Sequence, residues 1–166
     1  MRVLKGFLST VDLVNKILGY VLSLILLTMT ILIAWQVITR FVLGNPSSFS
    51  EELSRFLMIY LIMIGSAVAT RTGGMISVDV LLEAFESTKL RPILIIGAQI
   101  LSMIFYLILT VYGFQFAENS FNQIAPGTQI SMGWIYLSIP IGAIFLIMNS
   151  IGRIVSVIIG EEVETE

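Results

Sequence analysis

Histidine and cysteine are both missing from this chain of 166 residues, and charged side chains make up only 12% of it. Without cysteine there is no disulfide framework and no thiolate chemistry, and without histidine the commonest metal ligand and general base is missing. Nine basic residues nearly balance eleven acidic ones, which does not suggest a nucleic-acid partner. The sequence also lacks a phosphate-binding glycine loop and a nucleophile elbow. We therefore expect no enzyme activity and no cofactor held by this chain.

Apolar residues dominate what is present, since 57% of the chain is hydrophobic. A helix needs about 20 mostly apolar residues to cross the hydrocarbon core, and unbroken apolar runs favour helices over the strands of a membrane barrel. The sequence predicts an all-α membrane protein with a single integral membrane domain, residues 1–166. Its four transmembrane helices are expected at about 17–43, 49–70, 92–117 and 132–153. Pro140 lies inside the fourth helix and is expected to bend it.

Basic residues are distributed unevenly between the predicted loops. If both termini are cytoplasmic, only Arg40 and Arg55 lie on the opposite side of the membrane. The basic residues on the cytoplasmic side are then Arg2, Lys5, Lys16, Arg71, Lys89, Arg91 and Arg153. Cytoplasmic loops of membrane proteins carry an excess of lysine and arginine. We therefore expect both termini in the cytoplasm.

Two segments outside the predicted spans alternate polar and apolar residues with the period of a helix. They cover about residues 2–15 and 77–90. This pattern is typical of amphipathic helices that lie along a membrane surface. The first is expected to turn into the first span near Lys16, and the second to connect spans two and three. Their apolar faces could contact either lipid or a partner protein.

None of the predicted spans places a charged residue near the bilayer midplane, where an ion-coupled transporter working alone would need one. The polar side chains inside the spans include the amides of Gln36, Gln99, Gln115 and Asn149. Hydrogen bonding between helices is the simpler interpretation of these amides. The alternative is a solute path, in which case the chain would be a self-sufficient small oligomeric transporter or channel.

Charged residues gather between the end of the first span and the beginning of the second: Arg40, Glu51, Glu52 and Arg55. Glu51 and Glu52 precede Arg55 by four and three residues, which allows an ion pair within one helix. Arg40 can reach headgroups or these glutamates. The group either marks the end of a span or fixes the outer end of span two, within the chain or against a partner.

Three blocks of sequence, in their order along the chain, resemble the small membrane subunit of tripartite ATP-independent periplasmic (TRAP) transporters, also called the Q or DctQ-like subunit. The first block is VITRF at 37–41, with FSEELSR at 49–55 and GSA at 65–67. The second is RTGGMISVD at 71–79, and the third is GWIY at 133–136 with IPIG at 139–142. Together with the predicted spans, the resemblance covers nearly the whole chain.

The resemblance implies a subunit of the bacterial inner (cytoplasmic) membrane that braces a much larger membrane protein. That partner is expected to bind sodium and to transport the solute, a small organic acid anion such as a dicarboxylate or sialic acid. A periplasmic solute-binding protein is expected to deliver the solute. On the same resemblance, Arg71 and Asp79 would fix the cytoplasmic turn and its surface helix.

Overall fold

The computed structural model describes residues 2–45, 47–72 and 91–159 of the chain. Helix α1 spans Arg2–Phe41, α2 spans Ser48–Thr72 and α4 spans Arg91–Asn119. The short helix α5, Met132–Tyr136, is followed by α6, Ser138–Ile159. Among these residues, four helical stretches are long and apolar enough to cross a membrane, so the predicted all-α membrane fold with four spanning helices is confirmed. The expected surface helix at 77–90, with Asp79, lies outside the described residues.

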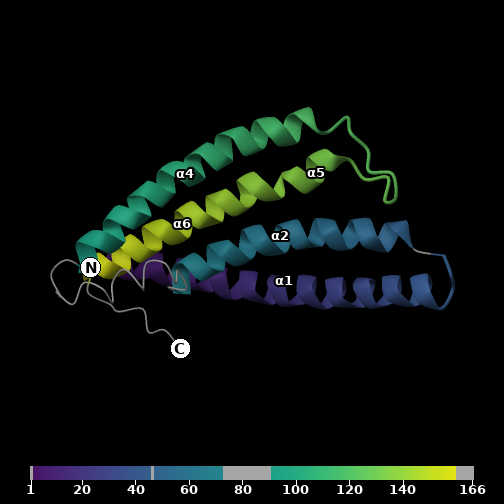
Figure 1. The fold of residues 1–166 in the computed structure, drawn as a ribbon. Helices are drawn as coiled ribbons and strands as arrows, with labels where there is room; N and C mark the ends of the chain where they lie inside the picture. Colours follow the sequence, from purple (N-terminus) through teal and green to yellow (C-terminus); the bar gives the residue numbers. More distant parts are fainter. Residues whose placement is uncertain (1, 46, 73–90, 160–166) are drawn as a thin grey trace.

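The helices are arranged side by side in the order α1, α2, α6, α4, as an open row (Figure 1). Helix α4 packs closely against α5 and α6, and within the described part of the chain its backbone does not come close to that of α1 or α2. The middle helices are correspondingly more buried. In the most apolar stretch of each span, 28% of the residues are buried in the second span and 39% in the fourth, against 6% in the first and 11% in the third. Two broad faces of the row are therefore left open.

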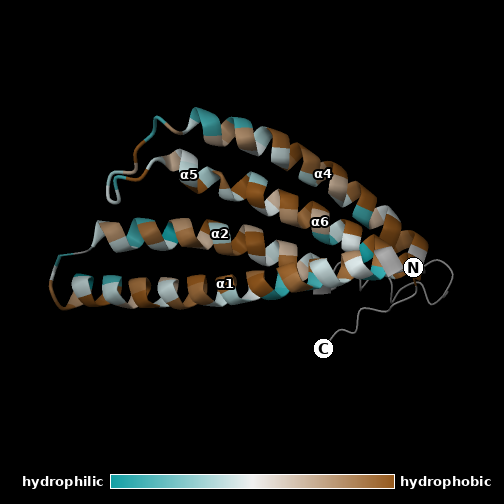
Figure 2. Cartoon of the chain, turned by 180° about the vertical axis from the view of Figure 1, so that it is seen from behind, coloured by the Kyte–Doolittle hydropathy of each residue, from teal (hydrophilic) through white to brown (hydrophobic). Residues whose placement is uncertain are grey.

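The two ends of the row differ in what they contain. One end, here called the loop end, carries residues 42–45, which follow α1, and the loop at 120–131. The other, here called the termini end, is where α1 begins and α6 finishes. Hydrophobic residues predominate along the middle of the helices, whereas hydrophilic residues are more frequent towards their ends (Figure 2). This distribution suits a row that spans a bilayer, because charged and polar groups are stable at its two surfaces.

Helix α1 differs from the expectation of a surface helix that turns into the first span near Lys16. It runs for 40 residues without a break, about 60 Å at the rise of an α-helix. With the exception of Val14, its buried and half-buried side chains follow one series spaced alternately by three and four residues: Leu8, Val11, Asn15, Leu18, Leu22, Ile25, Met29, Leu32, Gln36 and Thr39. This is the heptad spacing of helices that pack lengthwise. The series crosses residue 16 unchanged, so the packing seam favours a continuous helix.

The fourth span consists of two helices, with an interruption at Leu137. Pro140 lies in the first turn of α6, and it has no N–H to donate to the Tyr136 carbonyl one turn earlier. The predicted bend at this proline is therefore seen as a break between α5 and α6. Ser131 caps α5, since its hydroxyl accepts a hydrogen bond from the Gly133 N–H. The same hydroxyl donates to the Phe121 carbonyl at 2.6 Å and so attaches the loop to the helix.

Candidate functional site: polar ties at the two ends of the row

Glu52, near the beginning of α2, binds the tip of the loop at 120–131. Its carboxylate accepts hydrogen bonds from the Gly127 N–H at 3.0 Å and from the Thr128 N–H at 2.8 Å. The Thr128 hydroxyl also donates to it, at 3.2 Å. Successive backbone N–H groups of this kind form a concave site for an anion. A Cβ at Gly127 would lie 2.9 Å from the Glu52 carboxyl carbon, so a larger residue there would displace the Glu52 side chain from its present position.

Glu51, one residue earlier, lies on a different face of α2 and forms the predicted ion pair. Its carboxylate lies 2.8 Å from the Arg55 guanidinium, with the two side chains 53% and 59% exposed. The Gln36 amide of α1 donates to the same carboxylate at 3.4 Å. Arg40, which we expected to reach headgroups or these glutamates, has its guanidinium carbon 5.8 Å from the centre of the Phe41 ring. The predicted charged group is thus divided: Glu52 binds the loop at 120–131, whereas Glu51 and Arg55 form an exposed ion pair.

Aromatic side chains surround these contacts at the loop end. The Tyr60 hydroxyl of α2 donates to the Trp134 carbonyl of α5 at 2.6 Å. The rings of Phe121 and Trp134 pack edge to face with centroids 5.6 Å apart. The Phe116 and Tyr136 centroids are 4.6 Å apart. Because tyrosine and tryptophan concentrate at the boundary between membrane and water, this group is consistent with a bilayer surface at this level.

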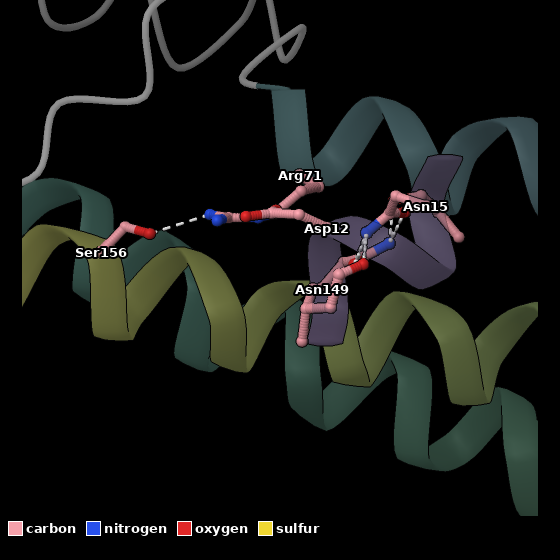
Figure 3. Close-up of polar contacts among 7 residues, drawn as sticks. Asp12, Asn15, Arg71, Asn149 and Ser156 are labelled. Atoms are coloured by element: carbon pink, nitrogen blue, oxygen red, sulfur yellow. Dashed lines mark hydrogen bonds and ion pairs between the residues drawn. The ribbon is translucent and has the colours of Figure 1, made fainter. Parts of the chain in front are cut away.

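At the termini end, Arg71 connects three helices through its guanidinium group (Figure 3). Its Nε lies 2.8 Å from the Asp12 carboxylate of α1. Its Nη1 donates to the Ser156 hydroxyl of α6 at 2.8 Å. The Arg71 side chain is only 9% exposed, whereas that of Asp12 is 56% exposed. A buried guanidinium is therefore neutralised by a carboxylate that still faces outward.

Asn15 and Asn149 form a reciprocal pair of amides beside Arg71 (Figure 3). The Asn15 amide nitrogen donates to the Asn149 oxygen at 2.7 Å, and the Asn149 nitrogen donates back at 2.9 Å. The Asn149 nitrogen also donates to the Ala67 carbonyl of α2 at 2.6 Å. Asn149 is fully buried and Asn15 is 9% exposed. Three helices are thus joined by hydrogen bonds within the apolar part of the row.

The four amides considered for a solute path lie at opposite ends of the row. Gln36 and Gln115 are within five residues of the loop ends of α1 and α4, whereas Gln99 and Asn149 lie towards the termini end. Gln36 and Asn149 make the interhelical hydrogen bonds expected of them. The Oε1 of Gln99 is buried with no hydrogen-bond partner among the described residues. The four amides therefore do not line a single path.

An apolar groove of about 380 Å³ runs between α2 and α4 above α6. Its walls include Met63 and Phe105, and Leu146 contributes from α6. The hydroxyls of Ser66 and Thr70 also line the groove, but each donates to a carbonyl of its own helix, those of Ile62 and Ser66. The groove therefore offers no group of polar side chains arranged to bind a small ion.

Sequence reasoning identified Glu51, Glu52, Arg55 and Arg71 but missed the partners of Arg71. Asp12 and Asn15 both fall in the segment at about 2–15 that was expected to lie along the membrane surface. Both lie on or beside the heptad series that continues through α1. That spacing, extended past Lys16, is the signal that could have found them, although it does not specify which residues lie opposite.

The fold and these contacts define an all-helical integral membrane protein whose polar groups mainly join its own helices. Residues 29–160 match the model of the DctQ component of tripartite ATP-independent periplasmic transporters. The chain therefore belongs to this family, which consists of transporter subunits and not of enzymes.

Three relatives agree with this assignment. The chain is similar to the sialic acid TRAP transporter small permease protein SiaQ of Vibrio cholerae, with 29% identity over 74% of this chain and 70% of the relative. It is 28% identical to the ectoine TRAP transporter small permease protein TeaB of Halomonas elongata, over 84% of this chain and 73% of the relative. It is also 32% identical to the sialic acid TRAP transporter permease protein SiaT of Haemophilus influenzae, over 73% of this chain but only 19% of that protein.

Proposed function

We propose that this chain is the small permease subunit that braces the large transport subunit of a TRAP transporter. The observation that carries this proposal is the open row, whose two broad faces are apolar and whose ends are tied by hydrogen bonds between helices. A transport domain that moves through the membrane needs a support that stays still. A row of spanning helices joined at both ends resists shear and leaves a wide face for a partner.

The relatives support a larger partner in the membrane. SiaT of Haemophilus influenzae contains a segment similar to this chain that covers 19% of its length, so in that protein the segment belongs to a much longer permease chain. For the present protein, we propose that a separate large subunit corresponds to the remainder of that longer chain. That subunit would bind sodium and the solute, because the described spans offer no group of charged residues near their middle.

We propose the bacterial inner membrane as the location, with both termini in the cytoplasm. The excess of basic residues at the termini end supports this orientation. The loop end would then face the periplasm, where a solute-binding protein docks. Glu51 and Arg55, each more than half exposed at that end, are available to such a partner, whereas Glu52 is already bound to the loop at 120–131.

The proposed solute is a small organic acid anion, such as sialic acid or a dicarboxylate. The names of two relatives include sialic acid, which supports this choice. A third relative is named for ectoine, so membership of the family does not by itself specify the solute. Growth of the native host on single carbon sources, with and without the gene for this chain, would identify the class.

The decisive experiment is purification of the tagged chain from its native host in a mild detergent, followed by mass spectrometry. We expect one large membrane protein with many spans to be recovered in a constant ratio. Reconstitution of that pair with the binding protein in liposomes should then give uptake that depends on a sodium gradient. Recovery of the chain alone, together with uptake by the chain alone in liposomes, would contradict the bracing function and support a self-sufficient transporter.

A further inference from the structure

The first third of α1 packs against α2 and α6 although its polar pattern also suits a membrane surface. Leu8, Val11 and Leu18 are 4%, 1% and 8% exposed, so they are covered by the rest of the chain. Lys5, Ser9, Asp12 and Lys16 are exposed. The same sequence could therefore place its apolar face on its neighbouring helices or on lipid, with little change in its own helical structure.

Polar contacts distinguish the two arrangements. Asn15 and Asn149 satisfy each other within the row, and Arg71 has its counter-charge from Asp12. If residues 2–16 swung away onto the membrane surface, the buried Asn149 amide would lose its partner on α1. The buried Arg71 guanidinium would lose its carboxylate in the same movement. Both losses are unfavourable, because an unpaired polar group or charge in an apolar environment carries a large desolvation penalty.

We propose that Asp12, Asn15, Arg71 and Asn149 form a polar lock that holds the first third of α1 upright against α2 and α6. The lock joins residues that are 59 and 134 positions apart in the sequence. Its α1 half, Asp12 and Asn15, lies before residue 29, where the match to the family model begins. When the lock is broken, the amphipathic segment is free to lie along the membrane surface. The proposal concerns the conformation of this chain and does not depend on its role in transport.

The absence of natural cysteine allows a direct test by disulfide cross-linking in native membranes. A Cβ at Gly152 would lie 3.3 Å from Val11 Cγ1, so the sulfurs of Val11→Cys and Gly152→Cys come within bonding reach. We expect this pair to form a disulfide rapidly under mild oxidation when the lock is intact. Adding Asp12→Ala and Asn15→Ala should slow the reaction by about tenfold or more, since the hydrogen bonds and the ion pair are then lost.

A second cysteine pair reports whether the rest of the row stays folded. A Cβ at Gly113 would lie 3.0 Å from Ile139 Cγ2, so Gly113→Cys with Ile139→Cys joins α4 to α6 far from the lock. This pair should form equally well with and without the Asp12 and Asn15 substitutions. Asp12→Glu, which keeps a carboxylate, should restore most of the 11 to 152 cross-linking when Asn15 is retained.

Two results would overturn the proposal. If the 11 to 152 pair fails to form with the lock intact while the 113 to 139 pair forms, the segment does not stand against α6 in the membrane. If the 11 to 152 pair forms at the same rate after Asp12→Ala and Asn15→Ala, apolar packing alone holds the segment and the polar residues are not a lock.

Discussion

The two ends of the helix row are tied by different kinds of contact. At the loop end, the ion pair between Glu51 and Arg55 joins residues four positions apart, and both side chains are more than half exposed. The Glu52 carboxylate there binds a loop 75 positions away, through backbone N–H groups that are only partly buried. At the termini end, the Asn149 and Arg71 contacts bridge residues 59 to 134 positions apart, and the side chains involved are nearly or fully buried except that of Asp12. Exposed pairs within one helix contribute little to stability, whereas buried polar groups are costly to leave unpaired. We therefore expect the row to be held mainly at its termini end.

Asn149→Ala should have the largest effect, because it removes hydrogen bonds to two other helices at once. Asn15 and the Ala67 carbonyl would each lose a buried partner. We expect the free energy of unfolding to fall by roughly 2–3 kcal/mol, combining unpaired groups with lost packing. Titration of the purified chain from mild detergent into SDS measures this fall. Gln115→Ala, at an exposed amide of α4, is the matched control and should change it little.

Asp12→Asn should be the next most damaging substitution, since it leaves the Arg71 guanidinium buried without a counter-charge. Removing one member of a buried ion pair costs about 3–5 kcal/mol, but the Asp12 side chain is 56% exposed, and water can replace part of the contact. We expect a loss of about 2 kcal/mol on this basis. The measurement is the same SDS titration.

The double variant Asp12→Asn with Arg71→Met tests the reason for that loss. It removes the charge as well as its partner, so it should be less destabilising than the sum of the single substitutions. The Ser156 hydroxyl, which then loses Arg71, can turn to a carbonyl of its own helix. Simple addition of the two losses would mean that the charges do not interact.

Sequence reasoning predicted the Glu51–Arg55 contact at the loop end but not the Asp12–Arg71 contact at the termini end. The reason is the number of residues that separate the two partners along the chain. The pair of Glu51 with Arg55 follows from helical spacing alone, and the break before Pro140 follows from its missing N–H. The contact of Asp12 with Arg71 depends on how two helices are aligned, which a single sequence does not display. The first span was predicted to begin at residue 17, where an uncharged run begins. In the structure, the series of buried side chains on α1 begins earlier, at Leu8.

The Glu52 contact shows a further limit, because its partners are backbone N–H groups. Nothing in the side chains around Gly127 indicates that a carboxylate binds there. Arg71 was expected to act with Asp79 at the cytoplasmic turn, and that pairing lies outside the described residues. The structure shows instead that Arg71 contacts Asp12, which lies 59 positions earlier in the sequence.

Glu52→Ala should have a smaller and more local effect than the substitutions at the termini end. The carboxylate binds the partly buried tip of a loop, so its removal should lower the free energy of unfolding by about 1 kcal/mol. Hydrogen exchange at the Gly127 and Thr128 amides should become faster, because these groups lose their acceptor. Glu118→Ala, at an exposed carboxylate near the end of α4, serves as the control. Unchanged exchange at both amides would show that the loop is held by its other contacts.

Arg55→Ala should have the smallest effect on stability, because the pair with Glu51 is exposed and lies within one helix. Such pairs contribute about 0.3–0.5 kcal/mol and weaken as salt screens the charges. We expect a loss within this range in SDS titrations at low ionic strength, and no measurable loss at high salt. The Gln36 amide would retain its contact with Glu51, so α1 and α2 stay joined at this end. A loss above 2 kcal/mol that persists at high salt would contradict the comparison, since the loop end would then hold the row as firmly as the termini end.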